Sequence, residues 1–123
     1  MKYLLSIFLF SMTLSVSGQN IANVFKYIEK EDVESIGNLL GEETDLCILE
    51  NQEILLKAEV KAKLSAFLSS NSPTSCEEVH SGDSKKKTSN YCLGKLKTIT
   101  GNQYRIFVFT EDSNIVEIRI DEW

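Results

Sequence analysis

The sequence contains little of the chemistry that most metal and catalytic sites require. His80 is the only histidine, and the chain has three cysteines, Cys47, Cys76 and Cys92. A catalytic zinc site usually needs three protein ligands, whereas Glu78 and His80 would supply two from one face of a predicted strand. None of the cysteines has a histidine at a useful spacing, so a thiol nucleophile is not indicated. We therefore predict no metal and no cofactor.

Basic residues are also scarce relative to acidic ones. The chain has 13 lysines and arginines against 18 aspartates and glutamates, a formal net charge of −5. Such a domain repels phosphate backbones, so nucleic acid is not an expected partner, and the same sign argues against an anionic membrane surface. The one run of like charge, Lys85-Lys86-Lys87, is interpreted as the solvated tip of a hairpin rather than as a docking patch.

The start of the chain has the pattern of a secretory signal. Lys2 precedes an apolar run that ends at Val16, and small residues follow at Ser17 and Gly18. The run is shorter than the roughly 18 apolar residues that cross a bilayer, and its order of charge, apolar run and small residues is typical of a cleavable signal peptide. We expect residues 1–18 to be removed by cleavage near Ser17 or Gly18. The product, residues 19–123, is one domain of net charge −6, exported to the periplasm or the cell exterior.

An exported chain with three cysteines can form at most one internal disulfide. If residues 81–90 form the loop between two strands, Cys76 faces Lys95, three residues and about 10 Å from Cys92 at strand rise. A disulfide requires Cα atoms within about 7 Å, so we favour buried thiols over a bridge. The first cysteine is Cys47, so lipid attachment at a new N-terminal cysteine is not expected.

Apolar residues at helical spacing predict two helices near the start of the domain and a longer one in its middle. The first carries Ile21, Val24, Phe25 and Ile28. The second is short, with Asp32 as its N-cap and Gly41 as its C-terminal stop. The third carries a stripe from Leu56 to Leu68 and ends at residues 71–73, where Pro73 cannot continue a helix.

Alternating apolar residues predict strands elsewhere in the chain. We expect strands at 44–49, 75–80, 91–99, 104–109 and 115–121, with a brief extended piece at 53–55. Tyr91 and Leu93 share one phase of the alternation and Leu96 has the other, which predicts a bulge or bend at Gly94. Short turns join the last four strands into an antiparallel meander. Helices grouped before such strands indicate an α+β domain, with N-terminal helices packed on a curved antiparallel sheet.

Several motifs together resemble a known family. They are Ala66 to Pro73, His80 to Gly82, Tyr91 to Thr98, and Tyr104-Arg105 after a glycine turn. In order and spacing they resemble the exported bacterial domain of unknown function 4783, within the nuclear transport factor 2-like or cystatin-like cone fold. The family often has paired phenylalanines where this chain has Phe67-Leu68. The resemblance implies a curved sheet that wraps helices around a pocket, and it implies export, but it supplies no activity.

Enzymes of this cone fold are expected to carry an acid or base inside the pocket. His80 is a candidate general base because histidine titrates near neutrality, with Asp83 or Tyr104 as its partner, and Asp45 is a further acid. The alternatives are a structural histidine at a turn, solvated surface positions for Asp45 and Asp83, and a half-buried packing role for Tyr104.

Three further residues are candidates for ligand binding: Phe67, Tyr91 and Arg105. Arg105 alternates with aromatic residues, so it could contact an anionic ligand or pair with an acidic residue on the neighbouring strand.

The sequence leaves three hypotheses for function. The leading one is a non-catalytic exported domain that binds a small apolar ligand or a protein partner through the cone pocket or the sheet face. The second is an isomerase or hydrolase that uses His80. The third is a structural homodimer that packs sheet on sheet.

Overall fold

A computed structural model describes residues 20–83 and 88–123. Its elements are α2 (Asn20–Glu29), α3 (Val33–Gly37), β1 (Leu40–Ile48), β2 (Asn51–Leu56), α4 (Lys57–Ser70), β3 (Pro73–Asp83), β4 (Ser89–Thr98), β5 (Gln103–Glu111) and β6 (Asn114–Glu122). The predicted leader with its cleavage positions, and Lys85 to Lys87, lie outside the described residues. Of the helices that are described, none has the length and apolar content needed to span a bilayer.

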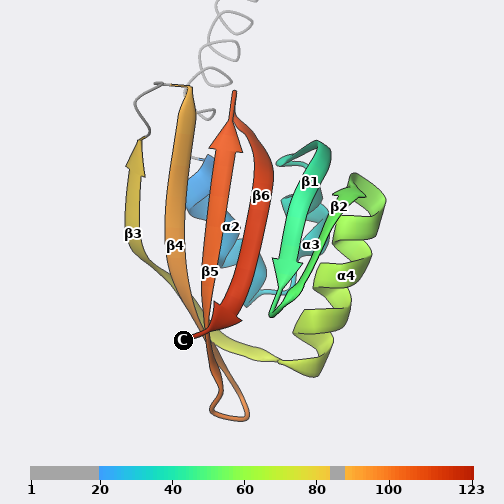
Figure 1. Ribbon diagram of the computed structural model, residues 1–123. Coiled ribbons are helices and arrows are strands. Elements are labelled where there is room, and N and C mark those ends of the chain that lie inside the picture. The colour runs from blue at the N-terminus through green and yellow to red at the C-terminus, as the bar shows by residue number, and fades with distance from the viewer. Residues whose placement is uncertain (1–19, 84–87) are drawn as a thin grey trace, which may run out of the picture.

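All six strands belong to one sheet, with the order β2-β1-β6-β5-β4-β3 (Figure 1). Strands β3 to β6 form the predicted antiparallel meander. The β1–β2 hairpin joins it through β1, which pairs with β6 in parallel. The predicted α+β class with helices on a curved sheet is confirmed. The parallel pair was not predicted, because β1 and β6 are far apart in sequence and no turn between them indicates a contact.

The helices follow the predicted stripes except at two places. Leu56, the expected first residue of the α4 stripe, instead ends β2 and is exposed, and α3 ends earlier than expected. Asp32 caps α3 as expected: its carboxylate accepts hydrogen bonds from the Ser35 N–H at 3.1 Å and the Ser35 hydroxyl at 2.6 Å. These bonds lower the pKa of Asp32. The helix ends at Gly37 rather than at Gly41, because Leu40 already begins β1 and buries its side chain in the core.

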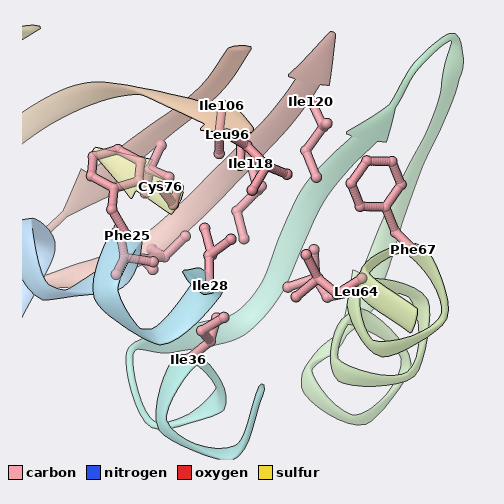
Figure 2. Packing of buried hydrophobic residues seen from close by; sticks show 14 of the residues in the cluster. Phe25, Ile28, Ile36, Leu64, Phe67, Cys76, Leu96, Ile106, Ile118 and Ile120 are labelled. Carbon is pink, nitrogen blue, oxygen red and sulfur yellow. The ribbon is translucent and has the colours of Figure 1, made fainter. Parts of the chain in front are cut away.

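The helices and one face of the sheet enclose a single apolar core (Figure 2). Phe25, Ile28 and Ile36 project from α2 and α3 toward sheet residues such as Ile106 and Ile118. The internal cavity at their centre has a volume of about 10 Å³. Its walls are Val24, Ile28, Ile36, Leu64, Leu68, Ile106, Val108, Ile118 and Ile120. The inside of the cone is therefore filled by the protein's own side chains, which leaves no room there for a ligand.

Gly94 provides the close approach that brings α2 onto the sheet. A Cβ atom at this position would lie 2.5 Å from Cε1 of Phe25, well inside van der Waals contact. The bulge predicted at Gly94 is instead on the neighbouring strand, where the register shifts between Glu78 and His80. The β4 alternation is unbroken, and Tyr91 and Leu93 lie on the outer face of the sheet, away from the helices. The sequence reading mistook these half-buried outer residues for core residues.

We expect Gly94→Ala to destabilise the fold by about 1–3 kcal/mol, the usual cost of overpacking a core. Gly41→Ala is the matched control, because a Cβ there would meet its nearest atom at 3.6 Å, and it should change stability by less than about 0.5 kcal/mol. Urea unfolding followed by circular dichroism measures both. Equal losses in the two variants would contradict the proposed role of Gly94.

Candidate functional site

A groove with a volume of about 740 Å³ lies between the β1–β2 hairpin and α4. We call it the β2–α4 groove. Its apolar lining consists of Leu46 and Ile48 from β1 and Ala66 and Phe67 from α4. Its polar lining consists of Glu50, Asn51, Gln52, Glu53, Lys63, Ser70 and Asn71. The groove thus combines an apolar interior with a polar rim.

Contacts with Tyr104 and Asn71 fix the position of Phe67 in this groove. The rings of Phe67 and Tyr104 pack edge to face, with centroids 5.2 Å apart. The Tyr104 hydroxyl donates to Oδ1 of Asn71 at 3.0 Å, and Nδ2 of Asn71 donates to the Phe67 carbonyl oxygen at 2.9 Å. Phe67, a predicted ligand-binding residue, therefore lines the groove on a rigid support, and Tyr104 positions it.

An ion pair crosses the groove between its two walls. Lys63 of α4 lies 3.4 Å from a carboxylate oxygen of Glu53 on β2, and both side chains are about half exposed. Exposed pairs of this kind contribute little to stability. A ligand could therefore displace or share this pair at small cost, while Glu50 adds a second carboxylate to the rim.

A different cluster of predicted residues lies on the outer face of the sheet. His80 is exposed, and its Nε2 lies 2.9 Å from the Tyr91 hydroxyl. Tyr91 in turn stacks on Phe107, with centroids 6.1 Å apart. Gly82 leaves space for this arrangement, because a Cβ there would lie 2.8 Å from the Tyr91 hydroxyl. His80 is thus a surface residue with an aromatic partner.

The structure separates His80 from Tyr104, one of its two predicted catalytic partners. His80 lies on the outer face, whereas Tyr104 is buried on the inner face with its hydroxyl already bonded. Asp83 ends β3 opposite Asn90, and its side chain is outside the described part of the chain. Asp45 accepts two hydrogen bonds from the Gln52 amide at 3.0 Å.

The structure also places Glu78 and Arg105, two other residues that the sequence singled out. The register shift between Glu78 and His80 removes the shared strand face that would have made them a ligand pair, and no cluster of three possible metal ligands occurs in the described residues. Arg105 was expected to pair with an acidic neighbour or to bind an anion. Asp121 lies opposite it in the register, but the contact that the structure forms is with the Trp123 ring, 5.1 Å from the guanidinium carbon.

The three cysteines are free thiols. Cys76 and Cys92 are buried as predicted, while Cys47 is half-buried on the outer face. Cys76 lies opposite Leu96 rather than Lys95. Leu96 is four residues from Cys92 along β4, which corresponds to about 13 Å at strand rise. The pair is therefore even farther apart than the sequence predicted.

The match of this chain to a protein family covers almost the entire predicted mature domain. The domain of unknown function DUF4783 matches residues 21–122. The chain belongs to this family. The resemblance noted from the sequence motifs is therefore confirmed.

Solved structures of the family have the same architecture. A DUF4783 protein from Bacteroides fragilis is 28% identical, with 82% of this chain and 96% of that chain covered and a TM-score of 0.72. One from Bacteroides uniformis is 24% identical, covers 82% and 94%, and has a TM-score of 0.73. An NTF2-like protein from Cytophaga hutchinsonii is 15% identical, covers 89% and 97%, and has a TM-score of 0.62. A cystatin-fold protein also matches, so the predicted NTF2-like or cystatin-like fold is confirmed. No curated protein matched the chain.

Most of the groove was missed by the sequence analysis. Phe67 was predicted as a ligand-binding residue, but Leu46, Ile48, Lys63 and Asn71 were assigned only to strands, a helix or a helix end. One available signal is the helical spacing of Lys63, Ala66, Phe67 and Ser70, which places a mixed polar and apolar stripe on one face of α4. That stripe indicates a groove only once the position of β2 is known.

The buried thiols allow a prediction about reactivity. Burial, with the Glu29 carboxylate nearby, raises the pKa of Cys76 to about 12, and burial, with Glu78 nearby, raises the pKa of Cys92 to about 12. The thiolate is the reactive form, so we expect iodoacetamide at pH 8 to modify only Cys47 in the folded protein and all three cysteines in urea. Mass spectrometry after digestion measures the labelling. Rapid native labelling of Cys92 would contradict the packing.

The same two thiols predict a loss of stability at alkaline pH. In the unfolded chain they lose protons near pH 9, whereas in the folded chain they keep them to about pH 12. Because the unfolded state then binds fewer protons, the free energy of unfolding falls as pH rises through this window. Urea midpoints between pH 8 and pH 10 measure the fall. Cys92→Ala should show a smaller fall, and an equal fall would assign the effect to other groups.

Proposed function

We propose that the mature protein acts outside the cytoplasm as a non-catalytic domain that binds a ligand with an apolar body in the β2–α4 groove. The observation that carries this proposal is the groove itself. Its volume of about 740 Å³ is within the range of about 300–1,000 Å³ that is usual for ligand sites. The filled core favours this groove over the inside of the cone as the binding place.

The lining indicates an amphipathic ligand. Leu46, Ile48 and Phe67 offer apolar contact, and the rim offers amide, hydroxyl, carboxylate and ammonium groups. Polar residues outnumber apolar ones in the lining, so a ligand of this groove would need hydrogen-bonding groups as well as an apolar body. Of the residues proposed from the sequence for catalysis, His80 and Tyr104 are not among those that line the groove, which favours binding over catalysis there.

Filling the groove tests this proposal. Ala66 lines the groove and is exposed, so Ala66→Trp should occupy it without disturbing the core. Ala62 is equally exposed on α4 but lies outside the groove, which makes Ala62→Trp the matched control. We expect the apolar fluorescent probe N-phenylnaphthylamine to bind the wild type, to bind Ala66→Trp about tenfold more weakly, and to bind Ala62→Trp within about twofold. No binding to the wild type, or equal binding to both variants, would contradict the proposal.

A homodimer that packs sheet on sheet is a second candidate, favoured by the outer face. Tyr91, Leu93, Phe107 and Phe109 form a half-buried apolar stripe on β4 and β5, and the described helices all lie on the other face (Figure 1). Lys95 and Arg105 lie at one end of this stripe, and Asp45 and Glu117 flank the other. A two-fold axis across the strands would bring these opposite charges together.

The mass of the protein in solution tests the homodimer. We expect light scattering at tens of micromolar to give a dimer for the wild type and a monomer for Phe107→Glu. Ala62→Glu, at an exposed position on α4, should remain dimeric. A monomeric wild type at that concentration would remove this candidate.

A further inference from the structure

We propose that the ligand of the β2–α4 groove is an extended peptide that pairs with the free edge of β2 as an additional strand of the sheet. This inference rests on the proposed function of the groove and names the class of its occupant. Three observations support it. The main-chain groups of β2 point outward, the opposite edge on β3 is partly blocked, and the groove beside β2 has a suitable position and charge.

The main-chain hydrogen bonds of β1 show which groups of β2 are free. The Leu49 N–H donates to the Ile120 carbonyl oxygen at 2.7 Å, which directs the odd-numbered residues of β1 toward β6. The even-numbered residues of β1 therefore face β2, and one of them, Leu46, pairs with Glu53. Because these directions alternate along a strand, Gln52 and Ile54 direct their N–H and C=O groups away from β1.

A second hydrogen bond supports the same phase. The Leu56 N–H, two residues beyond Ile54, donates to Oε1 of Glu59 on α4 at 3.4 Å. Leu56 thus also directs its N–H away from β1. With the Leu56 N–H bonded to Glu59, the outer side of β2 presents main-chain groups for an added strand at Gln52 and Ile54.

The opposite edge of the sheet is less suited to such pairing. On β3 the Cys76 N–H donates to Oε1 of Glu29 from α2 at 2.8 Å. Farther along, the register shift between Glu78 and His80 interrupts the regular spacing of the edge. Bulges and covering elements are the usual means of blocking edge strands. Among the described strands, β2 is therefore the edge with the more regular main-chain groups.

The groove lies beside this open edge. Asn51, Gln52 and Glu53 line it from β2, and the stripe of Lys63, Ala66, Phe67 and Ser70 lines it from α4. A strand added to β2 would direct alternate side chains toward this lining. On the other face of the sheet it would lie beside Ile54 and Leu56, which are 70% and 57% exposed. An extended peptide would therefore cover apolar surface on both sides.

The charge of the site selects among peptides. Glu50 and Glu53 line the groove, and the single cation there, Lys63, is already paired with Glu53. The whole chain has a formal net charge of −5. Charge complementarity therefore favours a peptide in which lysine or arginine flanks apolar, β-forming residues.

A substitution in the main chain separates this inference from groove binding in general. Proline at position 54 removes an outward N–H and leaves the hydrogen bonds to β1 in place. We expect Ile54→Pro to bind N-phenylnaphthylamine as the wild type does, but to bind fluorescein-labelled peptides of about eight residues with alternating valine and lysine about tenfold more weakly. Ile54→Thr keeps the main-chain N–H and removes only part of the apolar side chain beside the peptide. It is the control and should bind these peptides several-fold more tightly than Ile54→Pro does.

A modified peptide provides the second arm if the proline variant folds poorly. The same peptides with N-methyl groups at alternate residues lack the N–H groups that would donate to the carbonyl oxygens of β2. We expect them to bind the wild type about tenfold more weakly. Amide hydrogen exchange should also slow at Gln52 and Ile54 when the unmodified peptide binds, with little change at Glu53.

The outcomes distinguish this inference from the proposed function. Binding of N-phenylnaphthylamine without binding of any peptide in the set would overturn the peptide inference and leave the groove a ligand site. Peptide binding that is indifferent to N-methylation and to Ile54→Pro would do the same. Binding of neither probe would overturn both. A wild-type dimer that Ile54→Pro converts to a monomer would assign the β2 edge to a second copy of this chain.

Discussion

The parallel pairing of β1 with β6 determines most of what is distinctive in this structure. It attaches the β1–β2 hairpin to the edge of the meander, with Leu46 beside Ile118 and Ile48 beside Ile120. It also places β2 last in the sheet, directly before α4 in the chain. The groove and the free edge both follow from this one contact, because each requires β2 to have a neighbour on one side only.

The second constraint is the close packing of the core. Phe25 lies against Gly94, and the side chains of three helices meet those of the sheet around a cavity of about 10 Å³. Interiors packed to this density accept no guest without rearrangement. The interior of the cone is thus filled. The β2–α4 groove lies at its margin, where α4 leaves part of β1 and β2 uncovered.

Sequence patterns predicted the parts of the fold that depend on neighbours in the chain. The α4 stripe, the Asp32 cap and the β3–β6 meander are local, and spacing or turns reveal them. The β1–β6 contact depends on residues about 70 positions apart in sequence, which no local pattern encodes. Gly94 shows the same limit. The sequence suggested a bulge there, but the glycine is needed because the Phe25 ring, from a helix distant in sequence, packs where its Cβ would lie. The site was predictable only in part. Phe67 could be named from its motif, but the residues that face it across the groove come from β1 and β2.

The hydrogen bond from Cys76 to Glu29 has a consequence beyond its local effect on β3. A sheet with two open edges can join a neighbour at each end and grow without limit, as fibrils do. Because a carboxylate from its own helix occupies the Cys76 N–H, the β3 edge offers a less continuous row of main-chain groups than β2 does. Partial blocking of one edge disfavours the stacking of copies at both ends of the sheet.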